Sequence, residues 1–160
     1  MNAEPIDNTN PVIALCAEAM QIEGTGAEAK RLVERAWDLR RDDYDAAIVA
    51  HFLARHQPTA SDTLHWNTLA VHHAESVSDG RAEQFMASLY LNLADSQANV
   101  GDLTSAAASA ERATNHLTAV PAGGYHDLIA FGLRRLTERL ISLGSTARLA
   151  SLVTRHSSST

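Results

Sequence analysis

Cysteine, lysine and aromatic residues are scarce in this 160-residue sequence. Cys16 is the single cysteine, so the chain cannot form an internal disulfide, and Lys30 is the single lysine. Aromatic residues make up 5% of the chain, which argues against an all-β fold because such side chains commonly fill sheets. No long apolar run and no charged-then-apolar N-terminal signal is present. We therefore expect a cytoplasmic protein that has no membrane partner.

The common catalytic motifs are also missing. The sequence has no Gly-x-Ser-x-Gly elbow and no Walker loop, and Gly24-Thr25-Gly26 lacks the third glycine and the preceding strand of a dinucleotide-binding fingerprint. Cys16 occupies an apolar helical position, which favours a buried core thiol over a nucleophile. We therefore expect a protein that is not an enzyme and that uses no cofactor.

Histidine is concentrated in one stretch that ends shortly before Glu75. Its members are His51, His56, His65, His72 and His73. Their successive spacings are five, nine, seven and one residues, whereas two metal ligands on one helix face stand three or four apart. We expect no metal site and interpret these residues as surface, capping or packing side chains. His56, next to Arg55, is retained as a candidate for partner binding.

The net charge of −6 is unevenly distributed. The charge is −5 over residues 1–45, −4 over residues 46–126 and +3 over residues 127–160. An acidic body does not favour nucleic acid or an anionic membrane surface, so we expect neither partner. The C-terminal arginines are interpreted as a solvated face or as intramolecular partners of the acidic part: Arg134, Arg135, Arg139, Arg148 and Arg155.

Alanine and leucine, with 28 and 18 residues, dominate the composition and strongly favour helix. Apolar residues recur three and four apart in segments separated by glycine, proline or aspartate. The first helix is predicted to open at Asn10-Pro11 and the second to end at Arg40-Arg41. Further helices are predicted over 43–57, 61–77, 80–100, 102–119, 125–143 and 145–156. These eight helices predict one all-α domain over 11–156, with flexible ends at 1–10 and 157–160.

A fixed spacing of small residues recurs around two of the breaks. Gly24 is followed at the fifth and twelfth positions by Ala29 and Ala36, and Gly101 at the same positions by Ala106 and Ala113. Eight residues before these glycines stand the apolar residues Cys16 and Leu93, the latter followed by Ala94. Small residues let two helices approach closely, and glycine permits the turn between them.

This pattern resembles the tetratricopeptide repeat, most closely from Asn92-Leu93-Ala94 to Ala113. A second, degenerate copy has Ala54, Arg55, Asp62, Asn67 and Ala74 at the corresponding positions. A fourth copy keeps Leu136, Thr137 and Gly144 but has Leu149 and His156 where small residues are expected. The matched turns lie 38, 39 and 43 residues apart, which is similar to longer-helix bacterial variants of a repeat of about 34 residues.

The resemblance implies a right-handed solenoid of about four antiparallel helical hairpins, whose first helices line a concave face that binds a protein or peptide. It implies a polar binding stripe of Ser88, Asn92, Asp95 and Asn99, with Glu18 on the first hairpin and Arg135 and Glu138 on the fourth. Trp37 and Trp66 are expected to pack between adjacent hairpins. Two alternatives remain: an accessory protein that captures a small peptide ligand in the groove, and a homodimer.

Overall fold

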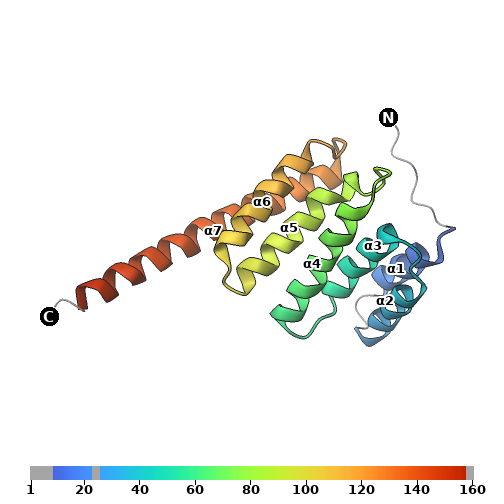
Figure 1. The fold of residues 1–160 in the computed structure, drawn as a ribbon, viewed down its shortest axis with the longest axis horizontal. Coiled ribbons are helices and arrows are strands. Elements are labelled where there is room, and N and C mark those ends of the chain that lie inside the picture. The colour runs from blue at the N-terminus through green and yellow to red at the C-terminus, as the bar shows by residue number, and fades with distance from the viewer. Residues whose placement is uncertain (1–8, 23–25, 158–160) are drawn as a thin grey trace.

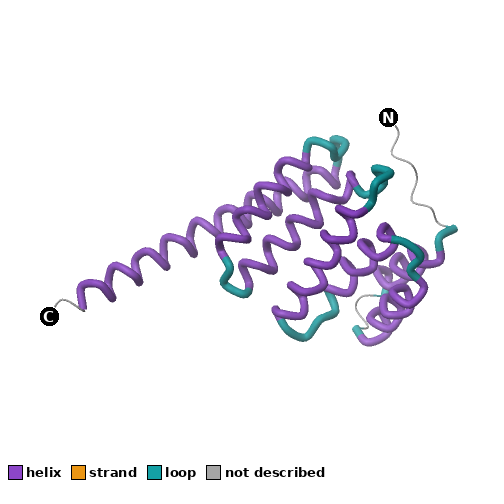
Figure 2. The backbone as a smooth tube through the Cα atoms, in the orientation of Figure 1, coloured by secondary structure: helices purple, strands orange, loops and turns teal. Residues whose placement is uncertain are grey.

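The computed structural model describes residues 9–22 and 26–157, with side chains described as far as Gly144. All regular structure in these ranges is helical, as predicted, and they contain no strand (Figure 2). The helices are α1 (Pro11–Gln21), α2 (Ala27–Leu39), α3 (Asp43–Ala54), α4 (Ala60–Ser76), α5 (Glu83–Asn99), α6 (Leu103–Leu117) and α7 (Gly124–Ser157). None of the described helices is both long and apolar enough to cross a membrane.

Local capping residues set several helix starts. Asn10 caps α1 as predicted, because its side-chain oxygen accepts a hydrogen bond from the Val12 amide at 3.0 Å. At α6, Gly101 has a φ of +85°, which suits glycine and ends the preceding helix. Asp102 then caps α6 by accepting from the Ser105 amide at 3.0 Å. The turn and the new helix are thus specified by neighbouring residues.

The helices pack in chain order, each against the next, and α1 also contacts α3 while α5 contacts α7 (Figure 1). Buried side chains form one cluster over α1–α3 and a second over α3–α7. Trp37 on α2 and Trp66 on α4 pack against both clusters, and their rings meet edge to face with centroids 5.0 Å apart. This contact agrees with the predicted packing of the two tryptophans between successive helix pairs.

The alanines of the predicted repeat lie in the helix contacts. Ala29, Ala36, Ala94, Ala106 and Ala113 all have 0% exposed surface. Cys16 is also buried, and burial, with a smaller contribution from Asp45, raises the pKa of its thiol to about 12. The sequence prediction of a core thiol at this position is therefore confirmed.

The C-terminal region differs from the prediction. Gly144 was expected to separate two helices, but α7 continues from Gly124 to Ser157, so the prediction of an eighth helix over 145–156 is wrong. With a rise of about 1.5 Å per residue, α7 is about 50 Å long, and its C-terminal half extends away from the other helices (Figure 1).

The predicted flexible ends fall mainly on 1–8 and 158–160, which lie outside the described residues. Asn10, predicted to belong to the flexible N-terminus, is buried as the α1 cap. Ser157, predicted to belong to the flexible tail, is the last residue of α7.

The burial of Ala106 leads to a stability prediction. Replacing Ala106 by Leu should lower the free energy of unfolding by about 1–3 kcal/mol, because the larger side chain forces α5 and α6 apart. Urea denaturation followed by circular dichroism measures the change. Ala108→Leu, on the exposed side of α6, serves as the control. Equal unfolding midpoints for the two variants would show that the repeat register is misplaced.

Candidate functional site

A small polar pocket lies where three helices meet near the predicted binding stripe. Its volume is about 200 Å³, and we call it the α3–α5 pocket. It is lined by His51, Ala54 and Arg55 from α3 and its end, Thr63 and Asn67 from α4, and Asn92, Asp95, Ser96 and Asn99 from α5. Three of the four predicted stripe residues, Asn92, Asp95 and Asn99, therefore share one pocket.

Asn67 forms the buried floor of this pocket. Its side-chain amide donates to Ser96 Oγ at 2.7 Å and to the Asn92 carbonyl at 3.5 Å. It stands at the repeat position that Ala29 and Ala106 occupy in the other pairs. From the sequence, Asn67 was predicted only as a degenerate repeat residue and not as part of the site. The sequence signal for this role was a polar side chain at a position where the other pairs have alanine.

His51 supplies an imidazole to the same pocket. Burial, and to a smaller extent the positive charge of Arg55, lower the pKa of His51 to about 4. The ring is therefore neutral near pH 7. Its Nδ1 lies 3.4 Å from the Asn92 amide nitrogen, which can donate to it. This role of His51 was not predicted, because the spacing of the histidines along the sequence does not show that His51 lies next to Asn92.

The C-terminal helix closes one end of the stripe. Arg139 donates to Asp95 Oδ1 at 2.8 Å and to Asn99 Oδ1 at 2.6 Å, and Asn99 in turn donates to Asp95 at 3.3 Å. Arg139 thus behaves as the predicted intramolecular partner of an acidic residue. Because Arg139 and Asp95 are both about half exposed, their ion pair contributes little to stability and can be exchanged.

Ser88, the fourth stripe residue, also contacts α7 rather than the pocket. It accepts a hydrogen bond from the Tyr125 hydroxyl at 2.8 Å and donates to the Phe85 carbonyl at 2.9 Å. Deeper in the same helix contact, a Cβ placed on Gly132 would lie 2.8 Å from a methyl of Leu91. Glycine therefore permits the close approach of α7 to α5.

The remaining predicted binding residues lie away from the pocket. Glu18 is exposed on α1, and His56 is half-buried beyond the end of α3. Arg135 and Glu138 are exposed on α7, where the Arg135 guanidinium lies 5.9 Å from the centre of the Phe131 ring. The structure does not bring these four residues together with Asn92, Asp95 and Asn99.

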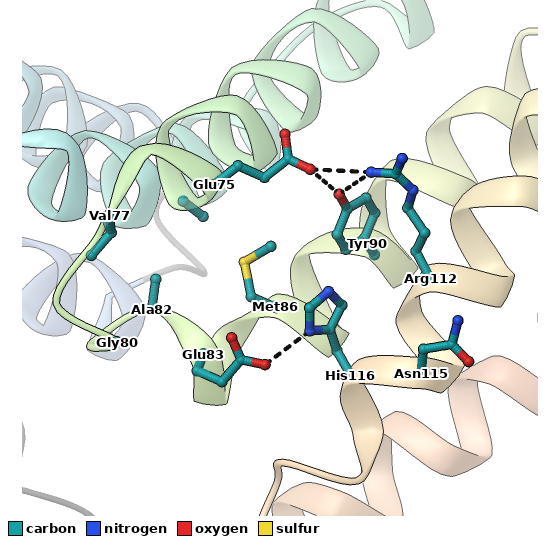
Figure 3. A pocket seen from close by; sticks show the side chains of 11 residues that line it. Glu75, Val77, Gly80, Ala82, Glu83, Met86, Tyr90, Arg112, Asn115 and His116 are labelled. Atoms are coloured by element: carbon teal, nitrogen blue, oxygen red, sulfur yellow. Dashed lines mark hydrogen bonds and ion pairs between the residues drawn. The ribbon is translucent and has the colours of Figure 1, made fainter.

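A second pocket, of about 430 Å³, lies among α4, α5 and α6 (Figure 3). The Tyr90 hydroxyl donates to Glu75, while Arg112 donates to that hydroxyl at 2.7 Å and to Glu75 at 3.1 Å. Burial, then the bond to Glu75, raise the pKa of Tyr90. His116 pairs with Glu83 at 3.0 Å. These polar groups are one another's hydrogen-bond partners, so we interpret them as contacts that hold α4, α5 and α6 together.

Metal-binding groups are not assembled in the described part of the chain. Across residues 9–22 and 26–144, no three histidine, cysteine, aspartate or glutamate side chains are grouped as a metal ion would require. The histidines make other contacts: His73, for example, pairs with Asp43 at 2.8 Å, and its ring centre lies 6.2 Å from that of Trp37.

The low pKa of His51 predicts a pH dependence of stability. The unfolded chain binds a proton at this histidine near pH 6.5, whereas the native protein binds it only near pH 4. The stability that the neutral ring contributes is therefore complete above about pH 6.5 and is lost as the pH falls towards 4. His51→Gln should reduce the loss of unfolding free energy between pH 7 and pH 4 by on the order of 2 kcal/mol.

Urea unfolding at a series of pH values measures this effect, with His56→Gln as a control outside the pocket. The same pH dependence in wild type and His51→Gln would contradict a His51 that stays neutral in the native protein down to about pH 4.

No protein family, no curated protein sequence and no solved structure matches this chain.

Proposed function

We propose that this chain is a tetratricopeptide-like solenoid that acts as a non-catalytic cytoplasmic module and binds an extended peptide segment across α3 and α5. The order of helix contacts and the burial of the repeat alanines support helical hairpins stacked side by side. Three pairs, α1–α2, α3–α4 and α5–α6, form the repeats in this proposal. The N-terminal part of α7 acts as the first helix of a further one.

The α3–α5 pocket is the observation that carries the proposal. Amides of Asn67, Asn92 and Asn99 surround it together with a neutral imidazole, and such groups both donate to and accept from a peptide backbone. Drug-sized ligands usually occupy pockets of about 300–1,000 Å³, so about 200 Å³ suits one side chain or one peptide unit. The rest of the ligand would then run along the outer surface of α5.

Two charged residues line the pocket, Arg55 and Asp95, and Asp95 offers a site for a basic residue of the peptide. Asp95 is the carboxylate among the lining residues, and Arg139 of α7 already occupies it. A lysine or arginine of the peptide can take the place of Arg139 on Asp95 at small cost because both partners face solvent. The exchange also frees the Asn99 side chain for the ligand.

Alanine at Asn92 and Asn99 tests this function. A random peptide library displayed on phage is selected on the wild-type protein, and a selected peptide is synthesised and labelled. Because each hydrogen bond contributes about 1 kcal/mol, the double variant should bind that peptide about tenfold more weakly or worse. Helicity and melting temperature should stay nearly unchanged, since both side chains reach solvent.

The matched control is Asn115→Ala, the same substitution in the second pocket. It should leave peptide affinity unchanged. If Asn115→Ala weakens binding and Asn92→Ala with Asn99→Ala does not, the peptide binds the second pocket and the proposed site is wrong. The proposal would also be wrong if no selected peptide bound the wild type more tightly than the double variant.

A further inference from the structure

An open groove of about 670 Å³ runs between α6 and α7, on the side of α7 away from Arg139. We call it the α6–α7 groove. Its lining is mostly aliphatic or small, with hydroxyl groups and one charge: Leu103, Thr104, Ala107, Ala110, Glu111, Thr114, Thr137, Leu140, Ile141 and Gly144. Ile141 is 65% exposed although it is a large apolar residue. The groove therefore leaves apolar surface uncovered in a single chain.

The groove lies beside α6 and α7, where one more helix would continue the stack. α6 itself packs against α5 and reaches α4 through the Arg112–Glu75 ion pair. A helix in the α6–α7 groove would have the same relation to α7 and α6. The repeat spacing assigned residues 145–156 to this position, but in the structure they continue α7 beyond Gly144. Residues 145–156 therefore do not occupy the groove of their own chain.

Length and sequence match the projecting segment to the groove. Residues 145–157 form about 20 Å of helix, and the lining stretch of α6 from Leu103 to Thr114 is about 17 Å long. In the sequence, Leu149, Leu152 and Val153 have the spacing of one helix face. These three residues span about 6 Å of helix, so the segment can present an apolar patch to part of the groove.

Charge also favours this pairing. The segment 145–157 contains Arg148 and Arg155 and no acidic residue. The groove has Glu111 as its charged lining residue, and residues 1–126 together carry a charge of −9, the sum of −5 and −4. Docking of the segment onto the body would bring opposite charges together.

We propose that residues 145–157 of a second copy of this chain fill the α6–α7 groove, and that the exchange is reciprocal. Because α7 is continuous through Gly144, its end points away from its own groove and is presented to another molecule (Figure 1). Two copies related by a twofold axis near Gly144 place each C-terminal segment alongside the partner's α6 and α7. Each chain then completes the helix stack of the other.

Light scattering of the full chain, coupled to size exclusion, tests the exchange with a matched pair of variants. Ile141→Asp places a carboxylate in the groove, whereas Leu128→Asp places one on another side of α7 at a residue that is 66% exposed, against 65% for Ile141. The wild type and Leu128→Asp should have the mass of two chains. Ile141→Asp should raise the dimer dissociation constant at least about tenfold.

Variants at and beyond Gly144 test whether residues 145–157 are the segment that fills the groove. Removal of residues 145–160 should give a folded monomer, with circular dichroism confirming the helices. A Cβ on Gly144 would meet no atom within 4 Å, so Gly144→Ala should strengthen the continuous helix and tighten the dimer. Gly144→Pro should break α7 and give a monomer, because the segment can then fold back into its own groove.

A monomeric wild type at high concentration would overturn the proposal and indicate that the segment occupies its own groove or none. A dimer that survives Ile141→Asp or the truncation would overturn it as well, because the contact would then lie elsewhere. Neither result depends on the peptide-binding function, since Ile141 and residues 145–157 are not part of the α3–α5 pocket.

Discussion

Close approach of neighbouring helices, made possible by alanine, is the constraint on which the structure depends. Sixteen of the buried side chains in the described part of the chain are alanines. At a fully buried position such as Ala36 or Ala113, the side chain is a single methyl group, and small side chains at a contact let two helices lie closer together. Each contact is weak, so stability comes from many contacts between adjacent helices, as in repeat proteins. The outward faces are then free to differ.

Asn67 departs from this constraint, and the polar pocket follows from the departure. An amide in place of an alanine methyl must find hydrogen-bond partners once it is buried. It finds them on α5, in Ser96 Oγ and the carbonyl of Asn92. Polar groups are thereby drawn beneath the α3–α5 face, where apolar packing would otherwise have sealed it. The same residue, Asn67, therefore explains why the second helix pair matches the repeat pattern poorly and why the pocket is polar.

Features encoded within a few residues could be predicted from the sequence, and features that join distant segments could not. The cap at Asn10 and the buried alanines such as Ala106 follow from local spacing. The prediction of a helix break at Gly144 was wrong. A glycine inside a helix lowers its stability by only about 1 kcal/mol, and no described contact forces a turn there. The bond from Arg139 to Asp95 spans 44 residues, so no local pattern reveals that α7 closes the stripe.

The long α7 has two contact sides with different chemistry. Arg139 faces α5 and holds the polar stripe, while Ile141 lines the groove beside α6. Two positions along a helix correspond to a rotation of about 200°, so these side chains lie on nearly opposite sides. Leu133 and Leu136 are buried between them against the body. This apolar contact does not depend on the Arg139–Asp95 ion pair, so the proposed displacement of Arg139 by a peptide would leave the α7 wall of the groove in place. The two proposed surfaces share no lining residue although α7 contacts both, so each can be occupied independently.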